Sequence, residues 1–276
     1  MNETPDRQRP TATADPHGSG TGFQQSEAVV RFASHIVSVL AARSNLPEPV
    51  VRQTLLLQLI EAVIAEDPGA AARLLETLRA RKIPLESLAD HYLPEAARAL
   101  GVLWSRDQAD FVDVTIGTAR LQALLRGLDS DAALDLSQRP VIGAVLMIVP
   151  GGEQHTFGAL VAASKLRRRG ISVCLRLMPR TNELREVLRS RHFDGAMISV
   201  GARENLDMAR KLVKLLRGSA ESNVPVIVGG ALLAECEDLA RETGADAATN
   251  DLDRALALCG VQASVTQTAG LRTRQG

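Results

Sequence analysis

Apolar side chains recur along this chain at two different periods, and the change of period divides it into two parts. From Val29 to about Leu128 they recur every three to four residues, which is typical of helices with one buried face. Short polar turns, several with proline, separate these runs. The pattern predicts an all-helical domain over 24–128, a bundle, with helices at about 29–40, 48–65, 68–83, 85–104 and 109–128.

Beyond a polar stretch at 129–139, predicted to be a linker, short β-branched runs alternate with amphipathic stretches. Five such βα units imply an α/β domain over 140–262 with a doubly wound, five-stranded parallel sheet and right-handed crossovers. The polar ends, 1–23 and 263–276, are predicted to be flexible tails. Strands are expected near 141–149, 171–177, 195–200, 224–228 and 245–248, and helices near 156–169, 181–191, 204–218, 231–243 and 251–259.

The loop at 150–158, Pro-Gly-Gly-Glu-Gln-His-Thr-Phe-Gly, follows the first predicted strand and opens a helix. Open α/β folds bind ligands at the carboxyl edge of the sheet, where this loop would lie. A single histidine at such a turn is more often a capping or hydrogen-bonded residue than a ligand. The position nevertheless predicts that His155 points at a ligand site and not into the core.

Two later features fall at the ends of their own predicted strands. Ser199 lies 44 residues after His155, and Gly229-Gly230 begins 30 residues after Ser199. Together they form the pattern E-x-H-x-x-G, S-x-G and G-G. This pattern resembles the fingerprint of cobalamin-binding domains, which is usually D-x-H-x-x-G followed by S-x-L and G-G. The resemblance covers roughly the C-terminal half of the chain and implies a flavodoxin-like cobalamin-binding fold.

The resemblance implies a role for each matched residue. His155 would be the metal ligand, below the cobalt, and Glu153, in place of the usual aspartate, would accept a hydrogen bond from the other ring nitrogen. Ser199 would hydrogen-bond the nucleotide tail of the cofactor, or else only end a strand. The remaining predicted cofactor-binding positions are Thr156, Phe157 and Gly158 in the loop, Gly201 where leucine is usual, and Gly229 and Gly230, which could also be a tight turn.

The helical half carries Leu100-Gly-Val-Leu-Trp104, which resembles a motif of the helical caps that cover the upper face of cobalamin. The resemblance implies that Trp104 lies near the upper axial ligand, although a lone tryptophan at a helix end could also be core. Caps of this kind often carry Glu-His ten residues later, where this chain has Val114 and Thr115. The upper ligand is therefore left unassigned.

Composition and motifs exclude several classes of protein. The chain has 32 basic and 32 acidic residues, so no strong direct attraction to nucleic acid is expected. Cys174, Cys236 and Cys259 have no metal-like spacing and are expected to be buried thiols in a reducing cytoplasm. No signal peptide or membrane span is evident, which favours a soluble cytoplasmic protein. Neither G-x-G-x-x-G nor G-x-S-x-G occurs in a suitable place, so dinucleotide-binding and hydrolase sites are not expected.

The architecture narrows the function. A mutase would need a further barrel of about 250 residues, and a DNA-binding regulator would need a helix-turn-helix module. A cap followed by a cofactor domain resembles the cobalamin-dependent antirepressors of the AerR/PpaA type. That resemblance implies a non-enzymatic, light-responsive regulator that binds a transcriptional repressor of photosynthesis genes. The alternatives are a corrinoid methyl carrier of a methyltransferase system and a haem-binding redox sensor on the same fold.

Overall fold

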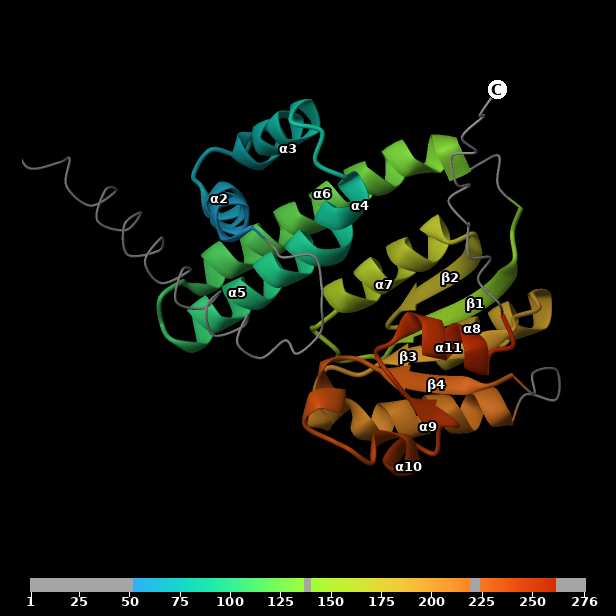
Figure 1. Cartoon of the computed structure of the whole chain (residues 1–276). Coiled ribbons are helices and arrows are strands. Elements are labelled where there is room, and N and C mark those ends of the chain that lie inside the picture. The colour runs from blue at the N-terminus through green and yellow to red at the C-terminus, as the bar shows by residue number, and fades with distance from the viewer. Residues whose placement is uncertain (1–51, 137–139, 219–223, 262–276) are drawn as a thin grey trace, which may run out of the picture.

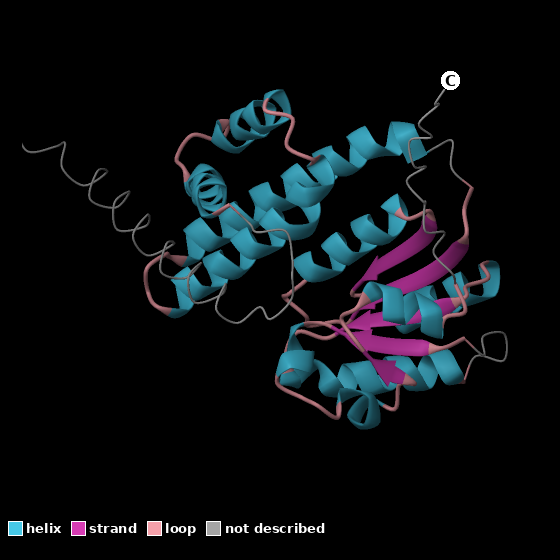
Figure 2. Cartoon of the chain, viewed as in Figure 1, coloured by secondary structure: helices cyan, strands magenta, loops and turns pink. Residues whose placement is uncertain are grey.

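The computed structural model describes residues 52–136, 140–218 and 224–261 and places a helical domain against an α/β domain (Figures 1 and 2). The first predicted helix, at about 29–40, and both predicted tails, 1–23 and 263–276, lie outside the described residues. Among the residues described, no helix has both the length and the apolar character needed to cross a membrane.

The helical domain, called the cap below, buries one apolar face of each long helix in a shared core. Fully buried side chains in this core include Leu56, Ile60, Leu100 and Leu121. They follow the helical period of the sequence, so the prediction of helices here is confirmed. The helices of the cap are α2 (Gln53–Ile64), α3 (Ala70–Ala80), α4 (Leu85–Ser87), α5 (Leu93–Ser105) and α6 (Phe111–Leu136).

One turn of π-helix, Leu88–Tyr92, joins α4 to α5, so the helix predicted at 85–104 contains a wider turn than expected. The Leu93 N–H donates to the carbonyl of Leu88, five residues earlier. Pro94 follows directly, and proline has no N–H and crowds the carbonyl four residues before it. An α-helical turn is therefore disfavoured at this point.

The predicted linker at 129–139 is wrong for most of its length, because α6 continues to Leu136. Serine and aspartate, which occupy 129–131, favour turns over helix interiors when no tertiary partner is present. In the structure Asp131 pairs with Arg79 of α3, and Asp129 accepts a hydrogen bond from Ser164 of α7 (Phe157–Arg168). These tertiary partners hold the polar turns in the helix, so tertiary context overrides local propensity.

The α/β domain contains one parallel sheet in the order β2-β1-β3-β4-β5, which confirms the predicted doubly wound fold. Helices α7 and α11 (Leu252–Leu258) cover one face, and α8 (Thr181–Ser190), α9 (Leu206–Arg217) and α10 (Leu239–Thr243) cover the other. The strands are β1 (Gly143–Val149), β2 (Ile171–Leu177), β3 (Gly195–Ser199), β4 (Val226–Gly229) and β5 (Ala247–Ala248).

The helix predicted at 231–243 is instead a 3₁₀ turn, Ala231–Ala234, and the short helix α10. The Leu232 N–H donates to the carbonyl of Val200 after β3, which ties the first turn to the sheet and not to a continuing helix. The three cysteines are buried and unpaired, as predicted. Burial, helped by the Asp194 carboxylate, raises the pKa of Cys259 to about 11, so this thiol stays protonated at neutral pH.

The cap and the α/β domain meet along α7. The Arg168 guanidinium, 10% exposed, pairs with Asp90 of the π turn and lies 3.5 Å from the Asp129 carboxylate of α6. The hydroxyl of Ser164 accepts from Arg168 and donates to Asp129. We call Asp90, Asp129, Ser164 and Arg168 the junction cluster. In this cluster the largely buried charge of Arg168 has partners from both domains, and a charge removed from water needs such partners.

Candidate functional site

The loops after β1 and β3 face each other at the carboxyl edge of the sheet. In this strand order the chain turns to opposite sides from β1 and from β3, so the two loops separate at a topological switch point. Such a point is where doubly wound folds bind their ligands. It brings together four predicted residues: Glu153 and His155 in the loop after β1, and Ser199 and Gly201 at and just after the end of β3.

Glu153 fixes the shape of this edge. Its side chain is buried, and Oε1 accepts from the His155 backbone N–H at 2.8 Å. Its Oε2 accepts from the Gly201 N–H at 2.6 Å and from Asn205 Nδ2 at 2.9 Å. The predicted role as acceptor for the His155 ring is not observed, because no bond between the two side chains occurs among the described residues. Glu153 therefore holds the backbone under His155, and Asn205 is a member of the site that the sequence reasoning missed.

His155 itself is exposed, and its ring lies against Gly201. A Cβ built at Gly201 would lie 2.9 Å from His155 Cβ and Cδ2 and 2.7 Å from Glu153 Oε1. No side chain fits there without displacing one of these groups. The two departures from the usual motif, glutamate for aspartate and glycine for leucine, are thus complementary, because the longer acid occupies space that a residue larger than glycine would need.

Ser199 ends β3 on the face covered by α7, since Met197 two residues earlier packs in that layer. Its half-buried hydroxyl has no hydrogen-bond partner among the described residues. Gly229 lies beside it in the sheet register. Ser199 is therefore available to a ligand at this end of the strand, and its contact with the cofactor tail stays a prediction.

Close contacts within the protein explain why positions 229 and 230 are both glycine. A Cβ at Gly229 would lie 2.7 Å from the Thr249 carbonyl oxygen. At Gly230, where φ is +108°, it would lie 2.3 Å from the Val200 carbonyl oxygen. The close backbone approach accounts for both glycines as a tight turn. Their contact with a cofactor stays a prediction.

At the start of α7, Phe157 has a structural role, whereas the neighbouring Gly158 leaves space for a ligand. Phe157 is buried in the cap core, so its side chain joins the two domains and is not free for the predicted cofactor contact. Thr156 directly precedes the helix and is half-buried. A Cβ at Gly158 would meet no atom within 4 Å. The Gly158 side of α7 is therefore open to a ligand.

The cap contributes an exposed apolar surface at the turn between α5 and α6. Trp104, at the end of α5, is 53% exposed, and Phe111, at the start of α6, is 71% exposed. Val112 and Ile116 are also exposed. We call these four residues the cap corner. The sequence predicted only Trp104, although the two apolar residues directly after Asp110, with Ile116 one turn later on the non-core side of the helix, are a detectable signal.

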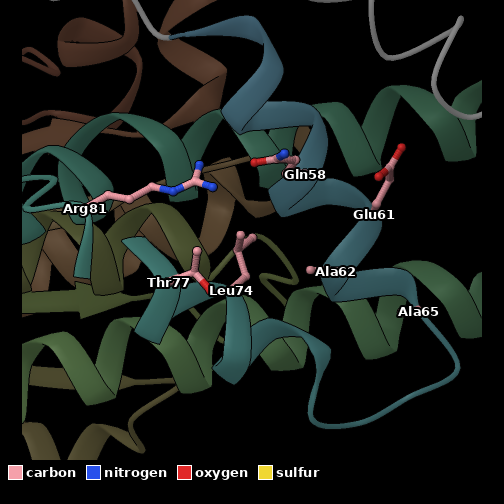
Figure 3. Close-up of a pocket in the computed structure, with 7 residues that line it drawn as sticks. All are labelled: Gln58, Glu61, Ala62, Ala65, Leu74, Thr77 and Arg81. Atoms are coloured by element: carbon pink, nitrogen blue, oxygen red, sulfur yellow. The ribbon is translucent and has the colours of Figure 1, made fainter. Parts of the chain in front are cut away.

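Two hollows among the described residues lie elsewhere. One, of about 370 Å³, lies between α2 and α3, with Glu61 and Arg81 on opposite walls (Figure 3). The other, of about 270 Å³, lies beside β4 and β5. Neither contains a predicted site residue. The layer between the sheet and α7 is closed by buried side chains, several of them small or flexible: Ala159, Ala163, Met147 and Met197.

The donor set at the carboxyl edge fits a metal that brings most of its own ligands. Among the described residues no three histidine, cysteine or acidic side chains gather as a metal site. His155 stands alone, exposed, on a loop that Glu153 fixes. A cobalt ion held by a corrin ring needs only one or two axial ligands, so this single imidazole fits it.

Comparisons with known proteins agree with this geometry. The sequence model of the B12 binding domain matches residues 143–256, from β1 to α11. An uncharacterized 20.5 kDa protein of Rhodobacter capsulatus from the bchF-crtJ intergenic region is 41% identical over 179 residues, covering 65% of this chain and 93% of that protein.

The likeness extends to a solved structure. The monomethylamine corrinoid protein of Methanosarcina barkeri superposes with a TM-score of 0.61 at 15% identity, covering 75% of this chain and 99% of that protein. At this identity the likeness shows the fold. None of these comparisons supports the haem alternative. The chain therefore belongs to the cobalamin-binding domain proteins and resembles those of the AerR/PpaA type.

Proposed function

We propose that this protein is a cobalamin-binding, light-responsive regulator that acts as an antirepressor by binding a DNA-bound repressor of photosynthesis genes. The observation that carries the proposal is the exposed His155 imidazole on a fixed loop at the switch point, in a chain that also has an exposed apolar cap corner. Its likeness to the Rhodobacter capsulatus protein of the bchF-crtJ region supports a role connected with those genes.

Each residue of the site would have one task. Bound cobalamin supplies a cobalt centre whose upper ligand can exchange on illumination. His155 would hold the metal from below, and Glu153 would keep the His155 backbone in place through its three hydrogen bonds. Ser199 would donate to the cofactor tail, and the cap corner would cover the upper face.

The junction cluster would be the contact through which a change in the position of the cap reaches the α/β domain. The cap corner would fit two states of the bound cofactor differently, and α7 is the element on which the cap rests. A regulator responds only as far as its two ligand states differ in free energy between two conformations. We propose that seating of the cap on α7 distinguishes those conformations and exposes or withdraws the repressor-binding surface.

Reconstitution tests the proposal. The purified protein is loaded with hydroxo-, methyl- and adenosylcobalamin, and spectra are recorded in the dark and in light. We expect His155→Ala to change the cobalamin spectrum, while His192→Ala, at another exposed histidine, leaves it unchanged. Capture of the repressor that is indifferent to both illumination and cobalamin would contradict the antirepressor role.

A corrinoid methyl carrier is the second candidate, because the Methanosarcina barkeri protein of similar fold is a monomethylamine corrinoid protein. It would use the same imidazole and cap. Stoichiometric transfer of the methyl group from the isolated methylcobalamin-loaded protein to a thiol acceptor would favour this candidate. Loss of the methyl group only on illumination would favour the regulator.

A further inference from the structure

The zero net charge of the chain conceals a strong segregation of charge. Residues 165–191 contain nine basic and two acidic side chains, a net charge of +7. Residues 52–136 of the cap contain nine basic and thirteen acidic side chains, a net charge of −4, and residues 192–261, leaving aside 219–223, contain seven and ten, a net charge of −3. The positive segment comprises the end of α7, β2 and α8, at one edge of the sheet (Figure 1).

Several of these basic groups form ion pairs within the described part of the protein, but four exposed arginines do not. Arg168 belongs to the junction cluster, Arg169 pairs with Asp253, and Arg176 lies 3.7 Å from Glu183. The arginines of α8 and its two flanks are exposed and form no ion pair with any residue that the structure describes: Arg180, Arg185, Arg189 and Arg191.

Two exposed apolar side chains lie at the end of β2, directly before Arg180 and α8. Leu177 is 43% exposed and Met178 is 52% exposed. Met178 has a φ of +48°, an uncommon conformation for a residue with a side chain. Its N–H donates to the Val149 carbonyl at 2.8 Å, directly before the loop that carries His155. The apolar pair is therefore fixed to the end of β1, next to the residue at which the cofactor loop begins.

The free edge of β2 does not favour pairing with another strand. Arg167 Nη2 donates to the Val173 carbonyl at 3.3 Å, and Arg176 Nη1 donates to the Leu175 carbonyl at 3.2 Å. Charged side chains along an edge strand oppose strand addition. A partner at this edge would therefore contact side chains and not extend the sheet.

The chemistry of this surface selects the class of partner. Arginine forks match carboxylates in pairs, and arginine and methionine are both enriched in protein interfaces. A phosphate backbone would offer nothing to Leu177 and Met178. It would also meet Glu186 on α8 and the net negative charge of the rest of the described chain. A protein segment with both acidic and apolar side chains complements all of these features.

We infer that the surface formed by Leu177, Met178, Arg180, Arg185, Arg189 and Arg191 docks an acidic, apolar segment of a partner protein. Identifying that partner with the repressor rests on the proposed function; the surface itself does not. The hydrogen bond between Met178 and Val149 places this surface next to the start of the cofactor loop.

The test uses the full chain and three labelled probes of equal charge: a peptide of alternating glutamate and leucine, poly-L-glutamate, and a DNA duplex. We expect the Glu-Leu peptide to bind more tightly than the other two in fluorescence anisotropy. Arg185→Glu with Arg189→Glu should weaken that binding by about tenfold or more. Lys211→Glu with Lys214→Glu, an identical charge change at exposed positions of α9, should leave it within about twofold.

A second variant addresses the apolar part of the surface. Met178→Asn keeps a residue that tolerates the left-handed backbone. It should weaken binding of the Glu-Leu peptide and leave binding of poly-L-glutamate unchanged. Equal loss for both peptides would show that the apolar pair takes no part.

Two outcomes would overturn the inference. Tighter binding of the duplex than of both peptides, abolished by the α8 double variant, would make this a nucleic-acid surface. Equal effects of the α8 and α9 variants would show a solvated face with no partner. Cobalamin spectra and melting temperatures are recorded for every variant. Failure of the wild-type protein to take up cobalamin would contradict the proposed function but not the docking inference.

Discussion

The two ends of α7 differ in how their polar groups are used. At its C-terminal end Arg168 is buried and shares its guanidinium among Asp90, Asp129 and Ser164. Before its N-terminal end the His155 ring is exposed and Gly158 faces open space. At the C-terminal end the polar groups are satisfied by partners within the protein. At the N-terminal end the imidazole and the open space remain free for a ligand. A single helix thus anchors the cap and presents the cofactor site.

Glu153 refines this comparison. It lies at the open end, yet it is buried and accepts three hydrogen bonds, like a member of the junction cluster. The open end therefore combines a fixed backbone with a free imidazole. Pre-organisation of this kind lowers the cost of ordering a site when the ligand arrives.

The largest expected effect is at the junction. Arg168→Met should lower the free energy of unfolding by about 3–5 kcal/mol, because it leaves two carboxylates without their buried partner. Urea unfolding measures the change. Arg169→Met is the control, since it breaks a more exposed pair with Asp253 and should cost less than about 1 kcal/mol. Equal losses would show that the junction cluster contributes no more than a surface pair.

Glu153→Ala should have the next largest effect. It removes the acceptor of three donors and should cost about 2–3 kcal/mol. Amide hydrogen exchange should accelerate at His155 and Gly201, whose N–H groups lose their partner. Glu183→Ala, at an exposed carboxylate, should change stability by less than about 0.5 kcal/mol. Unchanged exchange at both amides would mean that the loop does not need this carboxylate.

Gly201→Ala tests the complementary pair at the switch point. The new Cβ would displace His155 or Glu153 and should cost about 1–3 kcal/mol. Adding Glu153→Asp shortens the acid and should recover part of that loss, giving a coupling energy of about 0.5 kcal/mol or more in a double-mutant cycle. Strict additivity would contradict the complementarity of the two positions.

Gly158→Leu should have the smallest effect on stability and a large one on cobalamin. Leucine replaces glycine within a helix where space is open, so stability should stay the same or rise by up to about 1 kcal/mol. The side chain would block the approach to α7, and cobalamin uptake measured by absorbance should fall. Gly127→Leu, at an open position of α6, is the matched control. Normal uptake by Gly158→Leu would place the cofactor elsewhere.

The sequence predicts what local periodicity controls and misses what distant partners control. The βα alternation and the position of the His155 loop follow from strand and helix periods and from the place of loops in parallel sheets. The extension of α6 depends on Arg79 and Ser164, and the true partners of Glu153 include Gly201, 48 residues later. Contacts of this range leave no periodic trace in the sequence.

The π turn at Leu88–Tyr92 sets the angular relation between two parts of the cap. It places one more residue in its turn than an α-helix would, and each residue advances a helix by about 100°. Asp90, within the π turn, pairs with Arg168, while Trp104 lies near the C-terminal end of α5, which continues directly from that turn. If the same residues formed a continuous α-helix, the tryptophan would lie about a quarter of a turn further around the axis, so either the ion pair or the indole would lose its present direction.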